Sequence, residues 1–362
     1  MNEPWMSSLA DEAVYRARVR GCLLGGALGD ALGYPVEFSS LERIRAANSE
    51  RGVTGLLFAA DSDVARISDD TQMTLFTAEA LIQAHRRERL KGIGGGWALL
   101  VRWAYERWLE TQRHPGPEQA APPQSGAPEG GLITQAWLYA RRAPGNACVS
   151  GVAQMYAPDP GLALDGKPGE VNPDSKGCGA VMRSAPFGLV NSADGAFAMA
   201  ARAAQITHGH PTGYYAAGAL AAIVAHLVAG DSLEGAVLRT LRLLACHPGH
   251  EETSAALTEA VDLAGQGAAT AEKVETLGEG WVAEQALAIG VYCALVTPTV
   301  RDALLLSVNH SGDSDSTGSI CGNLLGARYG DHGLPHEWVE RVEGRAQIAA
   351  LADDLAAEGV RR

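Results

Sequence analysis

The chain has 362 residues, of which 46% are hydrophobic and 20% charged, so it can form one large or two smaller globular domains with a substantial core. The formal charge of −13 excludes non-specific binding to nucleic acid, which requires a basic surface. Residues 1–10 lack the basic start and apolar centre of a secretory signal, and the six cysteines form no C-x-x-C pair. We therefore expect a cytoplasmic protein with free, mostly buried thiols and no membrane attachment.

Helical periodicity dominates the sequence and strand alternation is almost absent, which predicts an all-α fold. Ser68, Asp194 and Ser232 are predicted helix caps, and Pro211 suits a first helical position. The apolar run 214–230 is short for a bilayer span and contains His226, so we interpret it as a buried core helix. Predicted helices cover 12–32, 69–89, 97–110, 132–141, 180–190, 195–207, 211–229, 233–245, 251–264, 282–296, 299–308, 317–327 and 337–357.

The chain is predicted to form one domain over 12–362, preceded by a flexible tail over 1–11. Two Gly- and Pro-rich segments, at about 114–131 and 157–179, are interpreted as loop insertions, and long loops are often functional. Neither marks a domain boundary, because the acidic segments described below lie on both sides of them.

The first predicted helix ends in the glycine-rich run 25–33, which allows close approach of another helix. Asp30 lies within this run, where a carboxylate is unfavourable unless it is paired or hydrogen-bonded. Glu37 follows a Gly-Tyr-Pro turn and is flanked by Val36 and Phe38. Two interpretations of Glu37 stay open: an ordinary exposed loop acid, or a carboxylate with a raised pKa that acts as a general acid or base.

Ser68-Asp69-Asp70-Thr71 is the first acidic cluster. The pattern is typical of a helix start, with Ser68 as the cap and the carboxylates facing the positive end of the helix dipole. Adjacent residues of a helix point about 100° apart, so one aspartate can face a cleft while the other supports a neighbouring ligand.

Two further segments are candidates for ligand binding. Residues 177–183 lead from the long loop into a predicted helix, whose first N–H groups can bind phosphate; a flexible loop end is the alternative. His208 follows Thr207 between two helices. Because no other Cys or His stands at zinc spacing, we interpret His208 as a ligand-contacting or capping residue and not as a zinc ligand.

The second acidic cluster is Asp313-Ser314-Asp315-Ser316, in a predicted loop before a helix. An extended D-x-D segment places both carboxylates on one side. An EF-hand is excluded, because Thr317 and Leu324 stand where further acidic ligands are required. A solvated turn is the alternative, but the small residues of the following helix favour a buried site. Together the two clusters offer four carboxylates and several hydroxyls, the ligands that hard divalent cations prefer.

These segments, in this order, resemble the ADP-ribosylglycohydrolase family, which includes dinitrogenase-reductase-activating glycohydrolases and ADP-ribosylarginine and ADP-ribosylserine hydrolases. The resemblance rests on Gly29-Asp30-Ala31-x-Gly33 with Glu37, on Ser68 to Thr71, on 177–183, on Thr207-His208 and on Gly312 to Ser316. It extends from about Gly21 to Gly330. Ser316 stands where many members have Thr, and Cys178 where some have Asn.

The resemblance implies a single compact all-α domain of orthogonally packed helices with a central cleft that holds two Mg²⁺ or Mn²⁺ ions. It implies Glu37 and Asp69 as catalytic residues. The implied metal ligands are Ser68, Asp69, Asp70, Asp313, Asp315 and Ser316. The implied substrate-binding residues are Gly177, Cys178, Gly179, Ala180, Val181, Met182, Arg183 and His208.

The implied reaction is hydrolysis of the bond between ADP-ribose and a modified protein side chain, with arginine as the expected acceptor. Serine-linked or O-acetyl-ADP-ribose is the first alternative, and a metal-dependent phosphohydrolase is another. A noncatalytic protein that blocks a toxin is a third, and the N-terminal tail could also block a partner. The expected partner is an ADP-ribosylated protein or another ADP-ribose derivative, and the expected oligomeric state is a monomer.

Overall fold

The computed structural model describes residues 9–60, 62–119 and 130–361, and this part of the chain is all-α, as predicted. Its only β-type pairings are two isolated bridges within the described residues, Ala65 with Val342 and Gly177 with Val282. The α-helices are α1 (Leu9–Gly33), α2 (Leu41–Ala47), α3 (Asp69–Lys91), α4 (Trp97–Arg113), α5 (Asn146–Ala153), α6 (Ala185–Leu189), α7 (Ala193–Ala204), α8 (Pro211–Val228), α9 (Leu233–Leu244), α10 (Glu251–Ala264), α11 (Ala271–Thr276), α12 (Ala283–Val296), α13 (Val300–Val308), α14 (Ser314–Tyr329), α15 (His336–Val339) and α16 (Arg345–Val360).

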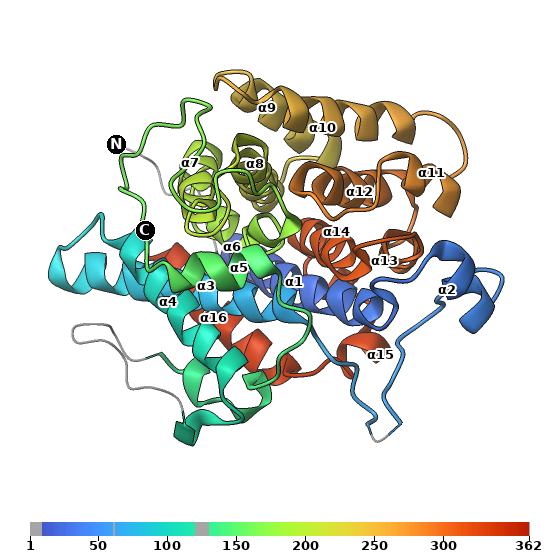
Figure 1. The fold of residues 1–362 in the computed structure, drawn as a ribbon, viewed down its shortest axis with the longest axis horizontal. Coiled ribbons are helices and arrows are strands. Elements are labelled where there is room, and N and C mark those ends of the chain that lie inside the picture. Colours follow the sequence, from blue (N-terminus) through green and yellow to red (C-terminus); the bar gives the residue numbers. More distant parts are fainter. Residues whose placement is uncertain (1–8, 61, 120–129, 362) are drawn as a thin grey trace.

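Helices α1 and α14 form the centre of the fold and lie side by side (Figure 1). Glycines of the two helices face each other along an antiparallel contact: Gly21 with Gly326, Gly25 with Gly322 and Gly29 with Gly318. A Cβ atom on Gly322 would lie 1.9 Å from the carbonyl oxygen of Gly25, a separation that no side chain can adopt. The glycines therefore bring the two backbones into direct contact, and this places the start of α14 beside the end of α1.

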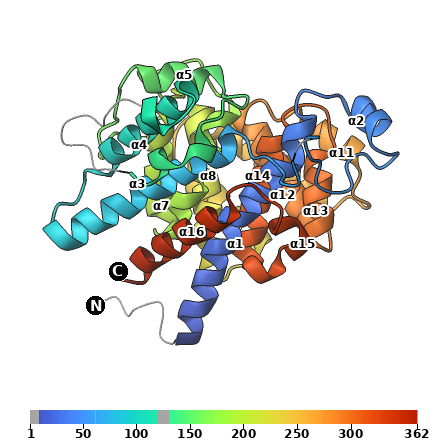
Figure 2. The ribbon, with the colours of Figure 1, turned by 90° about the horizontal axis from the view of Figure 1, so that it is seen from below.

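The other helices surround this pair. In Figure 1, α9, α10 and α12 lie on one side of it, and α3, α4 and α5 lie on the other. Figure 2, the view from below, shows α16 crossing α1. Helix α8 is long and apolar enough to cross a membrane, but 89% of it is buried among other helices, which confirms the predicted core helix. All six cysteines are free, and Cys178 and Cys246 are the two that are not fully buried.

Most predicted helices form within a few residues of their predicted bounds, and the predicted caps Ser68 and Ser232 and the first-turn Pro211 are confirmed. Asp194 lies inside α7, which Ser192 caps instead. Helices α2, α5 and α11 were not predicted, because each is short.

Three segments that were each predicted to form one helix do not do so. Residues 132–141 form two single 3₁₀ turns, Leu132–Thr134 and Ala136–Leu138, and the side chain of Gln72 donates to carbonyl groups of this segment in place of helical amides. Residues 180–190 divide into a 3₁₀ turn, Cys178–Ala180, and α6, since Pro186 begins a new helix. Residues 337–357 divide into α15 and α16, because Gly344 adopts φ 68° between them.

The predicted tail and loops lie partly outside the described residues. Helix α1 begins at Leu9, so residues 9–11 are helical, and residues 1–8 lie outside the described residues. Of the insertion at 114–131, residues 120–129 also lie outside them, and Pro117–Gln119 forms a 3₁₀ turn. Residues 157–177 have no helix or strand apart from the bridge at Gly177.

Candidate active site

Asp30 of α1 holds the start of α3. Its carboxylate is fully buried and accepts hydrogen bonds from the amide of Ser68 at 3.0 Å and from the amide of Thr71 at 3.1 Å. The hydroxyl of Thr71 donates to the same carboxylate. The hydrogen bonds satisfy the buried group, which the sequence marked as unfavourable without them. Burial, and then the negative charge of Asp315, raises the pKa of Asp30 to about 7.

The first acidic cluster forms the N-terminus of α3. Ser68 caps the helix, and its hydroxyl accepts from the amide of Asp70 at 3.2 Å. Asp69 and Asp70 are each only 3% exposed, although they are ionisable. Burial and the charges of Asp315 and Asp30 raise the pKa of both carboxyl groups. One oxygen of Asp70 is buried without a hydrogen-bond partner.

The second acidic cluster forms the N-terminus of α14. Asp313 is the N-cap and accepts from the amide of Ser316 at 3.3 Å, while Asp315 accepts from the same amide at 3.0 Å. Helix α14 begins at Ser314, so the predicted extended D-x-D loop is wrong. A cap and a first-turn residue, instead of alternating extended residues, place the two carboxylates close together. Burial and the charge of Asp315 raise the pKa of Asp313, whose second oxygen has no partner.

Glu37 lies against the second cluster. One carboxylate oxygen from each of Glu37, Asp313 and Asp315 lies within 4.8 Å of the other two. The short turn Tyr34–Val36 directs Glu37 there, and the amide of Glu37 donates to Gly33 at 3.0 Å. Burial, then the charges of Asp315 and Asp313, raises the pKa of Glu37 to about 10. The interpretation of Glu37 as an ordinary exposed acid is therefore wrong.

The two acidic clusters converge on one place. The charge of Asp313 contributes to the raised pKa of Asp70, and the charge of Asp69 contributes to that of Glu37. Like charges gathered in a buried site are strongly unfavourable unless protons or cations neutralise them. Three of these carboxylates also have a buried oxygen with no hydrogen-bond partner: Glu37, Asp70 and Asp313. Unpartnered carboxylate oxygens beside serine hydroxyls are the donors that a hard divalent cation requires, so these residues fit a metal.

The segment 177–183 lies beside the clusters, but most of its side chains point into the core. Burial and the charges of Asp313 and Asp70 raise the pKa of Cys178, which places its thiol next to the acidic site. The amide of Cys178 donates to the carbonyl of Trp281 at 3.1 Å and so cannot hold a phosphate. The side chains of the four residues that follow Gly179 are at most 2% exposed: Ala180, Val181, Met182 and Arg183. If the 3₁₀ turn Cys178–Ala180 binds a ligand, its backbone groups would therefore make the contact.

His208 packs directly under this segment. A Cβ atom on Gly177 would lie 3.3 Å from Nε2 of His208, and one on Gly179 would lie 3.2 Å from its Cε1. Nδ1 of His208 bonds to the hydroxyl of Thr207 at 2.7 Å, and Arg183 donates to that hydroxyl at 2.6 Å. Burial and the charge of Arg183 lower the pKa of His208 to about 3, so the ring is neutral.

One segment of the site was not found from the sequence. The carbonyl of Glu279 accepts from the amide of Asp313 at 2.8 Å, and Trp281 accepts from Cys178. Residues 278–281 therefore join the second acidic cluster to the 177–179 segment. The available signal was the pair Gly278 and Gly280 just before a helix, and both adopt positive φ.

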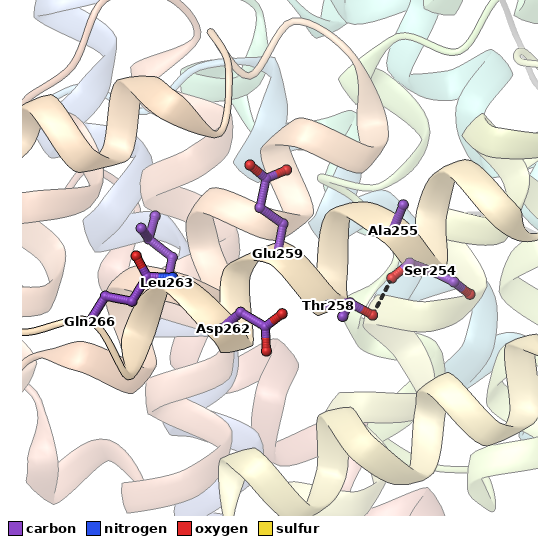
Figure 3. A pocket seen from close by; sticks show the side chains of 7 residues that line it. All are labelled: Ser254, Ala255, Thr258, Glu259, Asp262, Leu263 and Gln266. Atoms are coloured by element: carbon purple, nitrogen blue, oxygen red, sulfur yellow. Dashed lines mark hydrogen bonds between the residues drawn. The ribbon is translucent and has the colours of Figure 1, made fainter.

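An open hollow lies elsewhere, along α10 (Figure 3). It is lined by Ser254, Ala255, Thr258, Glu259, Asp262, Leu263 and Gln266. None of these residues belongs to the converging clusters. The hollow is therefore separate from the candidate active site.

Comparison with known proteins gives matches over nearly the whole chain. A family model described as ADP-ribosylglycohydrolase matches residues 11–362. The ADP-ribosyl-[dinitrogen reductase] glycohydrolase of Rhodospirillum rubrum is 26% identical over 345 residues, which cover 92% of this chain and 95% of that protein. The ADP-ribosylarginine hydrolase Tri1 of Serratia proteamaculans is 23% identical over 361 residues, 97% of this chain and 83% of that one. A solved "ADP-ribosylglycohydrolase-related protein complex" has the same fold, with a TM-score of 0.60, 21% identity and coverage of 96% of this chain and 99% of that chain.

Proposed function

The chain belongs to the ADP-ribosylglycohydrolase family, and we propose that it removes ADP-ribose from modified arginine side chains by metal-dependent hydrolysis. Hydrolysis of an ADP-ribose linkage is the activity that the family supports. The observation that carries the metal-dependent mechanism is that one carboxylate oxygen from each of Glu37, Asp313 and Asp315 lies within 4.8 Å of the other two. Arginine is proposed as the acceptor because one similar protein is named an ADP-ribosylarginine hydrolase.

Two divalent cations, Mg²⁺ or Mn²⁺, are proposed to bind between the acidic clusters. The proposed ligands from α3 are Ser68, Asp69 and Asp70, and those from α14 are Asp313, Asp315 and Ser316. The unpartnered oxygens of Asp70 and Asp313 support this assignment. When bound, such cations would orient the ribose hydroxyls and activate the attacking water.

Carboxylates of the protein are proposed to transfer the proton and to stabilise the positive charge that forms on the sugar. Hydrolysis of a glycosidic bond passes through a state with positive charge on the sugar, which nearby carboxylates stabilise. Glu37 is proposed to move the proton, because it lies at the edge of the cluster and is only partly buried. Asp69, which sits deeper and bonds to the backbone of Gly145, is proposed as the supporting carboxylate.

The diphosphate of the ligand requires donors in a strongly acidic protein. The backbone amides of Gly179 and Ala180, in the first turn after the long loop, are the proposed donors. His208 is neutral and packs under this turn, so it supports the turn without adding charge. We also propose that the protein acts as a monomer in the cytoplasm.

The test compares arginine-, serine- and acetyl-linked ADP-ribose as substrates, each with Mg²⁺, with Mn²⁺ and with a chelator. We expect release of free ADP-ribose from the arginine linkage only when metal is present, and no release by Asp313→Asn. AMP or phosphate as the product would indicate a phosphohydrolase instead. Release from none of the three linkages would contradict the proposed activity.

A further inference from the structure

Phe38 and Trp281 form a stacked aromatic pair at the edge of the acidic site. Their ring centroids are 5.1 Å apart and their planes differ by 23°. Phe38 is 66% exposed, so one face of its ring is backed by Trp281 while the rest meets solvent. A large aromatic side chain this exposed loses the hydrophobic stabilisation that burial would give. The position therefore requires an explanation outside the core.

The backbone holds Phe38 in an unfavourable conformation. Its φ is 65°, in the left-handed region that bulky side chains rarely adopt. The neighbouring amide of Ser39 donates to Val36 at 3.0 Å, which closes the turn around it. Strained residues of this kind cluster at functional sites. The result is a reversal of direction: Glu37 points inward, against Asp313 and Asp315, and the next residue points outward.

Trp281 is fixed to the same site. Its carbonyl accepts from the amide of Cys178, and the carbonyl of Glu279, two residues earlier, accepts from the amide of Asp313. In the stacked pair, Phe38 directly follows Glu37 in the chain. The backbone at and before Trp281 is hydrogen-bonded to the second acidic cluster and to the 177–179 segment. These backbone hydrogen bonds place the pair at the rim of the site.

We infer that the exposed ring of Phe38, supported by Trp281, binds the guanidinium group of the modified arginine and so selects the acceptor; this inference rests on the proposed function. The acceptor side chain belongs to another protein, which approaches from solvent and cannot enter the buried cluster. Consecutive Cα atoms are about 3.8 Å apart, so the backbone of Phe38 lies beside that of Glu37, while its ring faces solvent at the rim, where the acceptor protein would approach. A guanidinium is planar and cationic and stacks on aromatic faces, whereas a serine oxygen or an acetyl ester has neither property.

The test uses Phe38→Leu, which keeps an apolar side chain but removes the ring, and Phe38→Trp, which keeps a ring. Tyr329→Leu is the matched control, because Tyr329 is also an exposed aromatic residue, 49% exposed, at the far end of α14 from Asp313. Release of ADP-ribose from an arginine-linked peptide and from a serine-linked peptide is measured with Mn²⁺ present. Binding of free ADP-ribose is measured by calorimetry.

We expect Phe38→Leu to lower kcat/KM for the arginine-linked peptide by about three- to thirtyfold, mainly through KM, while Phe38→Trp and Tyr329→Leu stay near wild type. Binding of free ADP-ribose should be unchanged in all three variants. An unchanged kcat/KM in Phe38→Leu would overturn the role of Phe38 and leave the proposed function standing. An equal loss of free ADP-ribose binding would assign the ring to the ligand and also overturn the acceptor role. No release by the wild-type protein would overturn the proposed function itself, and with it this inference.

Discussion

Both carboxylate oxygens of Asp30 lie 3.0 Å from the backbone amide of Ser68, so a residue of α1 holds the first turn of α3. The two helices are far apart in sequence. Because Asp69 and Asp70 follow Ser68 directly, this contact fixes where the first acidic cluster points. The start of α14 is fixed against the same end of α1 by the glycine contact. Helix α1 thus positions both halves of the candidate metal site.

Replacement of Asp30 should therefore affect both stability and metal binding. Asp30→Ala leaves buried amides without an acceptor, and we expect the free energy of unfolding to fall by about 3 kcal/mol. Mn²⁺ affinity should fall as well, because the first turn of α3 loses its anchor. Thr71→Val is the matched control: it removes one donor to Asp30 but keeps the carboxylate, so its losses should be smaller. Chemical denaturation and calorimetry measure the two effects, and equal losses in both variants would contradict an anchoring role of Asp30.

The acidic cluster should destabilise the protein when no metal is bound. Asp313→Asn removes one of several repelling charges from a buried site, so we expect the metal-free variant to melt at a higher temperature than metal-free wild type. The same change should lower Mn²⁺ affinity by more than about 100-fold, the upper end of losses seen for partners of metal ligands. Differential scanning calorimetry with and without Mn²⁺ measures both effects.

Asp262→Asn, at an exposed position of α10, is the matched control for this experiment. It should change neither the metal-free melting temperature nor the rise in melting temperature when Mn²⁺ is added. If Asp313→Asn showed the same rise in melting temperature with Mn²⁺ as wild type, the second acidic cluster would not be a metal site.

The stability of the metal-free protein should fall as pH rises. The folded-state pKa of Glu37 is raised from 4.5 to about 10, and those of Asp69, Asp70 and Asp313 are raised as well. The unfolded chain therefore loses these protons first, and the stabilisation present at low pH is lost between about 4.5 and 10 for Glu37. Mn²⁺ should reverse the trend over this range, because it binds the deprotonated carboxylates. Melting temperatures measured against pH, with chelator and with Mn²⁺, test this, and parallel curves would contradict it.

The glycine contact between α1 and α14 should tolerate no side chain. In Gly322→Ala the new Cβ would overlap the carbonyl of Gly25, and we expect a loss of about 3 kcal/mol in the free energy of unfolding. Gly131→Ala is the control, since a Cβ there meets no atom within 4 Å and φ is −71°. Urea denaturation compares the two variants. A loss of similar size in both would show that the helix contact is not the cause.

Much of this fold could be predicted from the order of the amino acids. Periodicity predicted most of the helices because an amphipathic or buried helix repeats its apolar residues locally, as in α3 and α8. The two acidic clusters could be recognised because their hydroxyls and carboxylates are adjacent in the chain. Helices were mispredicted where distant residues act on the backbone: Gln72 binds the carbonyl groups of 138 and 140, and the helix expected there does not form.

Which residues meet in the site could not be predicted in this way. The role of Asp30 requires the start of α3 to reach α1, and the closeness of Glu37 to Asp313 and Asp315 requires the glycine contact to place α14 beside the end of α1. Likewise, Arg183 is a charged residue in a predicted ligand segment, yet it is buried against Thr207. Residue type and spacing give the chemistry that a chain can perform, but distances between residues far apart in sequence depend on the packing of whole helices.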